Sequence, residues 1–208
     1  LHLSIRRQRQ MCIRDRYSLV ADLSEPEETN TVIERTVDML GGLDILVNNA
    51  AYNTWIPFND LDALTYEEWH KILDINLTGP MLCTKAVALS MKSQGGGRIV
   101  NISSVAGLAP NGSSIAYAVS KAGLNHLTKC MAVGLAPDIL VNCVAPGYME
   151  GTGMSTNLSP QHRRDAVEGA LLKRTANKDD IAKQVVEFCR TDSITGQTLV
   201  IDSGRVFH

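Results

Sequence analysis

The chain has 208 residues, of which 44% are hydrophobic, 20% charged and 5% aromatic, and its formal net charge is −2 at pH 7. This length suits one domain with a sizeable core, and the ordinary apolar content excludes disorder and collagen-like repeats. The near-neutral balance disfavours nucleic acid and anionic membrane as partners, and no apolar run approaches the roughly 18 residues of a membrane-spanning helix.

The first sixteen residues differ from the rest of the chain. They hold five arginines against one aspartate, and they lack both apolar periodicity and the apolar centre of a secretory signal. A basic arm that contacts nucleic acid is one interpretation. We favour a foreign segment, because Met11–Asp15 resembles the translation of a sequencing-library adapter and the chain opens with Leu1. We therefore expect residues 17–208 to form the domain.

The domain begins with a predicted strand, helix and strand. Tyr17–Leu23 is a short β-type run, and the helix after it has Ser24 as N-cap, Pro26 in its first turn and a stop at Gly41-Gly42. Leu43–Val47 is a mostly apolar run of the kind that is buried on both faces of a parallel sheet.

Helices and strands continue to alternate to the end of the chain. A polar loop with short helical pieces, from Tyr148 to about Ala170, is expected to cover the substrate, with Arg163 and Arg164 on its solvated surface. The order predicts an α/β fold with a parallel sheet and right-handed crossovers. Helices are expected at Tyr66–Lys92 (loosened near Gly79-Pro80), Ile115–Ala136 and Asp179–Arg190, and strands at Arg98–Ile102, Ile139–Val144 and Thr198–Ile201.

Cysteines and histidines are scattered along the sequence. An odd, unclustered set of cysteines is typical of reduced thiols in the cytoplasm, and no zinc or iron ligand spacing is present, so we expect no metal site. The residues are Cys12, Cys83, Cys130, Cys143 and Cys189, and His2, His70, His126, His162 and His208.

Tyr117 and Lys121 stand four residues apart on a predicted helix, hence on one face. A tyrosine with its ordinary pKa of about 10 is a poor acid or base at neutral pH, and lowering that pKa to about 7 requires roughly 4 kcal/mol. An exposed pair at this spacing supplies only about 0.5 kcal/mol. The shift therefore needs a dry site and a second cation, such as a positively charged nicotinamide ring.

Ser104 follows the predicted strand Arg98–Ile102 and lies 13 residues before Tyr117. Ligands bind at the carboxyl ends of parallel strands. A serine hydroxyl there could donate a hydrogen bond to a substrate oxygen and stabilise alkoxide charge. Ser103 is expected to point the other way and to have a structural role. Taken alone, the spacing of Tyr117 and Lys121 would indicate an exposed pair on a helix surface.

From Tyr17 to its end the chain resembles the short-chain dehydrogenase/reductase (SDR) family. Seven segments in the family's order carry this resemblance, where any one alone would be weak. They are Asp22-Leu23, Asn48–Ala51, Asp74–Leu77, Ile102–Gly107, Tyr117–Lys121, Val141–Gly147 and Thr195–Asp202. The resemblance implies a Rossmann-like, doubly wound parallel sheet, NAD or NADP as cofactor, and a homotetrameric parent protein.

The resemblance also implies a role for each matching residue. Tyr117 would be the general acid/base, Lys121 would lower the Tyr117 pKa and hold the nicotinamide ribose, and Ser104 would orient and polarise the substrate oxygen. Asn76 would hold a water of the proton relay; the alternative is a kink inside its helix.

The remaining matches would hold the cofactor or the fold. Pro146, Gly147 and Met149 would border the nicotinamide, and Asn142 would tie strands together. Thr152, one place later than the family's threonine, is a weaker candidate. Asp22 and Leu23 would contact the adenine ring, although Asp22 could merely close a strand, and Asn49 and Ala50 would line the adenosine ribose.

The chain departs from the family at its start. The family's glycine-rich turn, Gly-x-x-x-Gly-x-Gly, is expected to be absent together with the strand before it, the helix after it and the second strand. Sixteen foreign-looking residues stand in place of about one βαβ unit, which would expose edges of Leu43–Val47. Ala51 stands where the family often has glycine, a mild change.

The function implied is hydride transfer between NAD(P) and a carbonyl or secondary alcohol. A 3-oxoacyl reductase or a small alcohol or sugar dehydrogenase would be typical, and the chain as it stands is expected to bind cofactor poorly. The alternative is a non-catalytic nucleotide-sensing or scaffold protein on the same fold.

Overall fold

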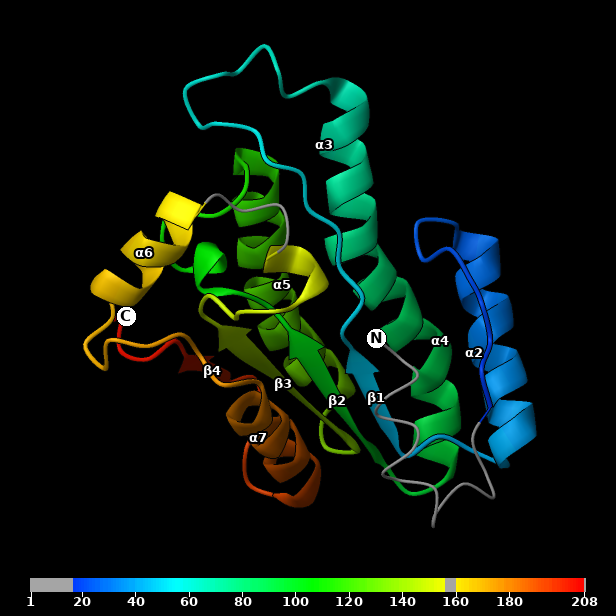
Figure 1. Cartoon of the computed structure of the whole chain (residues 1–208). Coiled ribbons are helices and arrows are strands. Elements are labelled where there is room, and N and C mark those ends of the chain that lie inside the picture. Colours follow the sequence, from blue (N-terminus) through cyan, green and yellow to red (C-terminus); the bar gives the residue numbers. More distant parts are fainter. Residues whose placement is uncertain (1–16, 156–159, 208) are drawn as a thin grey trace.

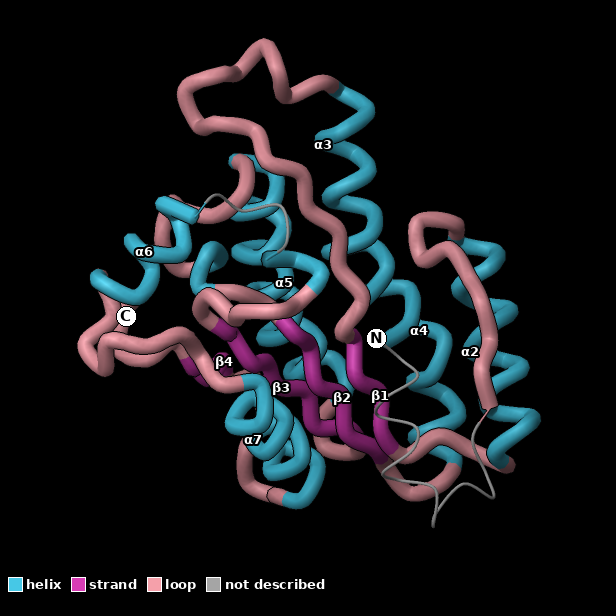
Figure 2. The backbone as a smooth tube through the Cα atoms, in the orientation of Figure 1, coloured by secondary structure: helices cyan, strands magenta, loops and turns pink. Residues whose placement is uncertain are grey.

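The computed structural model describes residues 17–155 and 160–207; the expectation for residues 1–16 falls outside them. In the described part, four parallel strands form one sheet in the order β1-β2-β3-β4 (Figures 1 and 2). The expected α/β fold with a parallel sheet is confirmed. The strands are β1 (Ile45–Asn48), β2 (Gly97–Ile102), β3 (Ile139–Pro146) and β4 (Thr198–Ile201).

Helices cover both faces of the sheet. In Figure 1, α4 and α5 lie on one face and α7 on the other, while α2 packs beside α4. Short helices of other kinds occur at Asp74–Thr78 (a π-helical turn), Val105–Gly107 and Gly153–Ser155 (both 3-10). The α-helices are α2 (Pro26–Leu40), α3 (Tyr66–Leu73), α4 (Gly79–Ser93), α5 (Ile115–Leu135), α6 (Pro160–Glu168) and α7 (Lys178–Arg190).

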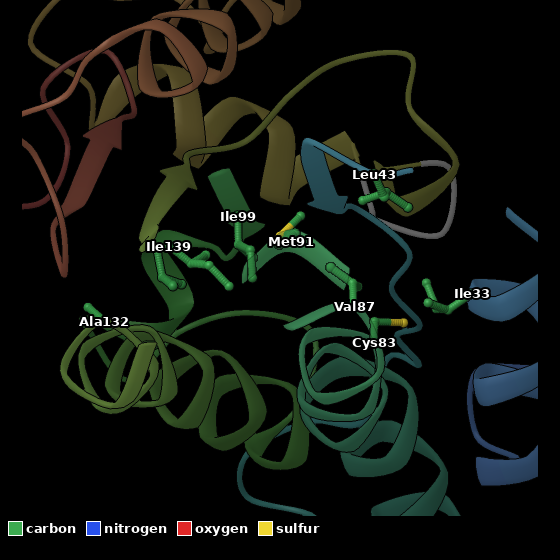
Figure 3. Close-up of a cluster of buried hydrophobic side chains, with 9 residues drawn as sticks. Ile33, Leu43, Cys83, Val87, Met91, Ile99, Ala132 and Ile139 are labelled. Atoms are coloured by element: carbon green, nitrogen blue, oxygen red, sulfur yellow. The ribbon is translucent and has the colours of Figure 1, made fainter. Parts of the chain in front are cut away.

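The alternation of side chains along β2 divides the core into two clusters. Ile99 joins the larger cluster, where Val87 and Met91 of α4 and Ile139 of β3 are fully buried (Figure 3). Val100, the next residue, faces the other side and packs with residues of α7 such as Phe188. The sheet is therefore buried at its centre on both faces, which positions the carboxyl ends of β2 and β3 rigidly.

The predicted long helix Tyr66–Lys92 is confirmed with its break. The π-helical turn Asp74–Thr78 separates α3 from α4 immediately before Gly79. By length and mean hydropathy, Tyr66–Ser93 could span a bilayer. Its buried side chains, however, pack against the sheet, as a core helix of a globular domain does.

Three local predictions are wrong. Residues 17–23 form no strand, because a strand needs a neighbouring strand to pair with and no described strand adjoins them. The N-cap of α2 is Glu25, with Pro26 at the first helical position, while the Ser24 hydroxyl donates to Asp22 (2.7 Å).

The third error concerns β1. Ile45 and Val47 were expected to be buried on both faces of the sheet, but they are 48% and 41% exposed. β1 is the edge strand of the described sheet, so the other expectation, that edges of Leu43–Val47 are exposed, is confirmed.

Candidate active site

The carboxyl ends of β2 and β3 open into a cavity of about 180 Å³. Ser104, Tyr117 and Lys121 line it together, so helix α5 presents its tyrosine and lysine to the same space as the serine. Of the other predicted site residues, Asn49, Pro146, Gly147, Met149 and Thr152 line it, while Asp22, Leu23, Ala50 and Asn76 do not.

Helix capping places Tyr117 in the first turn of α5. The hydroxyl of Ser114, the N-cap, accepts a hydrogen bond from the Tyr117 amide (3.1 Å). Burial raises the pKa of Tyr117, and a side-chain hydrogen bond with Ser104 lowers it by less. Desolvation disfavours the phenolate, so a dry site by itself acts against the acidic tyrosine expected from the sequence.

Lys121 lies one turn further along α5 and is only 2% exposed. Its ammonium donates to the carbonyl of Ile102 (2.9 Å) and lies 5.8 Å from the centroid of the Tyr117 ring. Burial lowers the pKa of Lys121 to about 8. Lys121 is not among the causes that shift the pKa of Tyr117, which are burial and the hydrogen bond with Ser104, so the expected lowering by the lysine is not seen.

Close backbone packing fixes the serine against the helix. Ser104 is the N-cap of the 3-10 turn Val105–Gly107, and its hydroxyl accepts from the amide of Ala106 (3.2 Å). A Cβ on Gly107 would lie 2.6 Å from the carbonyl carbon and oxygen of Lys121, so only glycine permits this approach. Ser103 donates its hydroxyl to that same Lys121 carbonyl (3.1 Å), a structural contact.

Asn76 is fully buried inside the π-helical turn. Its Oδ1 accepts from the amide of Tyr52 (2.8 Å), and its Nδ2 donates to the Tyr52 carbonyl (2.9 Å) and the Ser120 hydroxyl (3.1 Å). The side chain therefore holds the Tyr52 backbone beside α5, and the structure does not bring it into the cavity.

Of the residues expected near the adenosine, Asn49 lines the cavity, whereas Asp22, Leu23 and Ala50 do not. Asp22 is exposed and accepts from the amide and hydroxyl of Ser24, and the hydrogen bond from the Ser24 hydroxyl is the main cause that lowers its pKa. Leu23 packs against the core beside Gly79. Asn142, by contrast, ties strands as expected: Nδ2 donates to the Ile194 carbonyl (2.7 Å) and Oδ1 accepts from Gln197 (3.1 Å).

The donor set fits the nicotinamide end of a cofactor. The buried Lys121 ammonium has three donors, and Ile102 takes one of them, which leaves donors for ribose hydroxyls. Gly147 brings bare backbone to the cavity, since a Cβ there would lie 2.7 Å from Cβ of Asp202.

The diphosphate end is different. The spacing Gly-x-x-x-Gly-x-Gly, expected to be absent, does occur once, at Gly147, Gly151 and Gly153. It follows β3 and ends in the 3-10 turn Gly153–Ser155, after which residues 156–159 lie outside the described part, so the described residues show only a three-residue helical turn there and no helix N-terminus that would bind a phosphate. Within residues 17–155 and 160–207, no other stretch has that spacing.

Several cavity residues were missed by the sequence reasoning. Ser113, Tyr148, His162 and Arg205 all line the cavity. The only signal for them was the expectation that the loop after Pro146 borders the substrate, which covers Tyr148 and His162. Arg163 and Arg164 are exposed, as expected; Arg163 pairs with Glu150 (2.6 Å).

The chain is similar to known proteins over most of its length. A family model described as enoyl-(acyl carrier protein) reductase matches residues 6–205. A 3-oxoacyl-[acyl-carrier-protein] reductase from Synechocystis sp. is 37% identical over 191 residues, covering 89% of this chain and 74% of that protein. The Homo sapiens protein named dehydrogenase/reductase SDR family member 4 is 36% identical over 189 residues, 89% of this chain and 67% of that protein.

A solved structure has the same fold. The gluconate 5-dehydrogenase from Burkholderia cenocepacia, in complex with NADP and tartrate, superposes with a TM-score of 0.81. It is 30% identical to this chain, and the match covers 88% of this chain and 72% of that one.

Proposed function

The chain belongs to the short-chain dehydrogenase/reductase family of oxidoreductases, and we propose that it transfers a hydride between NAD or NADP and a carbonyl or secondary alcohol. The observation that carries the proposal is the convergence of Ser104, Tyr117 and Lys121 on one cavity. Reduction of a 3-oxoacyl thioester and oxidation of a small alcohol or sugar are the substrate types we consider.

In the direction of reduction, Tyr117 donates its phenolic proton to the carbonyl oxygen, and an O–H bond forms there. NADH or NADPH, held beside Lys121 and Gly147, would supply the hydride that the carbonyl carbon accepts. Because burial raises the pKa of Tyr117, the phenol is protonated at neutral pH and ready to act as an acid. Ser104 donates a hydrogen bond to the same oxygen as negative charge develops.

Lys121 acts after Tyr117 has given up its proton. With a pKa of about 8 its ammonium is mostly protonated at pH 7, so it stabilises the tyrosinate and holds the nicotinamide ribose. Asn76 acts as a positioning residue, because its amide fixes Tyr52 and bonds to Ser120 on the helix that carries Tyr117 and Lys121.

Cofactor choice and affinity form a separate part of the proposal. Pro146, Gly147 and Met149 would border the nicotinamide, and Asp22, Leu23, Asn49 and Ala50 would lie on the adenosine side. Because no described helix offers a glycine-rich phosphate cradle, we expect weak cofactor binding. The alternative is a non-catalytic nucleotide-sensing or scaffold protein on the same fold; such a protein has no need of Ser104, Tyr117 and Lys121 in one cavity, so their convergence argues against it. We further propose that the protein is located in the cytoplasm and assembles as a homotetramer.

The decisive experiment follows NADH and NADPH oxidation with a 3-oxoacyl thioester and with small ketones. Tyr117→Phe should lower kcat by about 10²-fold or more, because it removes the proton donor. Tyr66→Phe is the matched control, since Tyr66 is 73% exposed on α3 and does not line the cavity. Equal rates for wild type and Tyr117→Phe would refute the mechanism, and cofactor binding without turnover would support the alternative.

A further inference from the structure

Ser113 carries an unused hydroxyl in the wall of the cavity. Its side chain is 4% exposed, and among the described residues its Oγ has no hydrogen-bond partner. Only its backbone is engaged, the carbonyl accepting from the Ile56 amide (2.8 Å). The preceding Gly112 lies against Tyr117, since a Cβ there would be 3.3 Å from Cδ1 of the tyrosine. A buried hydroxyl without a partner is costly, so a ligand oxygen is its natural complement.

The charged groups of the wall are all positive. Of the described residues that line the cavity, Lys121 and Arg205 are the formal cations, and none is a carboxylate. Arg205 has no ion pair with a described carboxylate. Burial and Arg205 lower the pKa of His162, and Asp165, a carboxylate outside the cavity lining, opposes them by less, so Arg205 is the cation that acts on this side of the cavity.

The turn that carries Arg205 is firmly built. Asp202 accepts backbone hydrogen bonds from Gly204 (2.9 Å) and Val206 (2.6 Å), which occupy its two carboxylate oxygens. Ser203 and Gly204 have positive φ values of 62° and 77°, so the chain reverses sharply just before the arginine. Asp202, the carboxylate nearest to Arg205 in sequence, therefore stabilises the turn with both of its oxygens.

We propose that the substrate is a small hydroxy- or oxo-carboxylic acid, with its carboxylate paired to Arg205 and a second oxygen hydrogen-bonded to Ser113. The inference rests on the proposed function, in which Tyr117 acts on the reacting oxygen. A guanidinium matches a carboxylate with two parallel hydrogen bonds, whereas an apolar acyl chain would leave both the arginine and the serine without partners.

Glycerate and glycerol form a matched pair of probes, because they share two hydroxyls and differ by the carboxylate. Their binding to the full chain is measured by NMR titration without cofactor. Glycerate should bind at least tenfold more tightly than glycerol. Arg205→Gln should remove this difference, and Arg205→Lys should restore part of it. Ser113→Ala should weaken both probes alike.

Arg163→Gln is the control, because Arg163 is exposed and pairs with Glu150 outside the cavity; it should leave both affinities unchanged. Equal binding of the two probes, no glycerate binding at millimolar concentration, or an Arg205→Gln variant that binds glycerate normally would overturn the proposal. So would an Arg205→Gln variant whose loss is in affinity for NADPH or inorganic phosphate, since the arginine would then serve the cofactor.

The two proposals can fail separately. If Tyr117→Phe abolishes NADPH oxidation while Arg205→Gln changes neither glycerate binding nor the KM for carboxylate substrates, the substrate class is wrong and the oxidoreductase function stands. If glycerate binding follows the expected pattern but no carbonyl compound is reduced, the oxidoreductase function is wrong and the carboxylate site stands.

Discussion

Replacing Lys121 with methionine should stabilise the fold while removing activity. The side chain is 2% exposed, and burial lowers its pKa from 10.5 to about 8. At about 1.36 kcal/mol for each pKa unit, the charged form is disfavoured in the folded chain by roughly 3 kcal/mol at pH 7. The variant also loses the hydrogen bond to Ile102, which costs about 1 kcal/mol, so Lys121→Met should raise the free energy of unfolding by about 2 kcal/mol.

The same reasoning predicts a pH dependence. Below pH 8 the lysine is protonated in both states, and the cost of burying its charge is fully present. Between about pH 8 and 10.5 the unfolded chain binds more protons than the folded one, so the stability of the wild type rises with pH. Lys121→Met should lack this rise, and its advantage should disappear near pH 10.5.

Urea unfolding followed by circular dichroism at pH 7 and at pH 10 measures both effects. Lys85→Met is the matched control, because Lys85 is exposed on α4 and should give neither the gain nor the change in slope. A Lys121→Met variant that is less stable than the wild type at pH 7, with an unchanged dependence on pH, would refute the reasoning.

Three further outcomes are expected. Gly107→Ala places a Cβ 2.6 Å from backbone atoms of Lys121 and should lower the free energy of unfolding by about 3 kcal/mol, roughly 6–12 °C in Tm. Gly134→Ala is the control, because a Cβ there meets nothing within 4 Å, and it should raise the free energy of unfolding by about 0.5–1 kcal/mol. Equal thermal melts for the two variants would contradict this. Ser104→Ala removes the hydrogen bond that lowers the pKa of Tyr117, so Tyr117 should ionise at higher pH. The phenolate absorbance of Tyr117 is obtained by subtracting the titration of the Tyr117→Phe variant, and a curve that does not move would count against the hydrogen bond. Cys130 is the exposed thiol of the four described cysteines, and Cys130→Ser should remove the fastest reaction with Ellman's reagent; a fast phase that survives would show another accessible thiol.

Much of the scaffold could be read from short stretches of sequence. The strand Thr198–Ile201 and the helix from Ile115 were predicted closely, because apolar periodicity and the glycines and prolines at their ends act over a few residues. The spacing of Tyr117 and Lys121 predicted one helix face, and both line the cavity with Ser104.

Local pattern failed where the partner of a segment decided its state. Tyr17–Leu23 has the composition of a strand but is not one, because strand formation requires pairing that its own residues cannot provide. Asn76 matched a family motif, yet its side chain bonds to Tyr52, 24 positions away. Neither outcome is encoded within the segment itself.

By itself, the sequence determined the alternation of helices and strands, the parallel α/β fold and the residue types at the end of β2 and on α5. Only the tertiary structure decided that burial raises the pKa of Tyr117 and lowers that of Lys121, and that Ser113 and Arg205 share their cavity. Periodicity and capping depend on neighbours within a turn or two, whereas desolvation and charge pairing depend on which distant residues exclude water from a group.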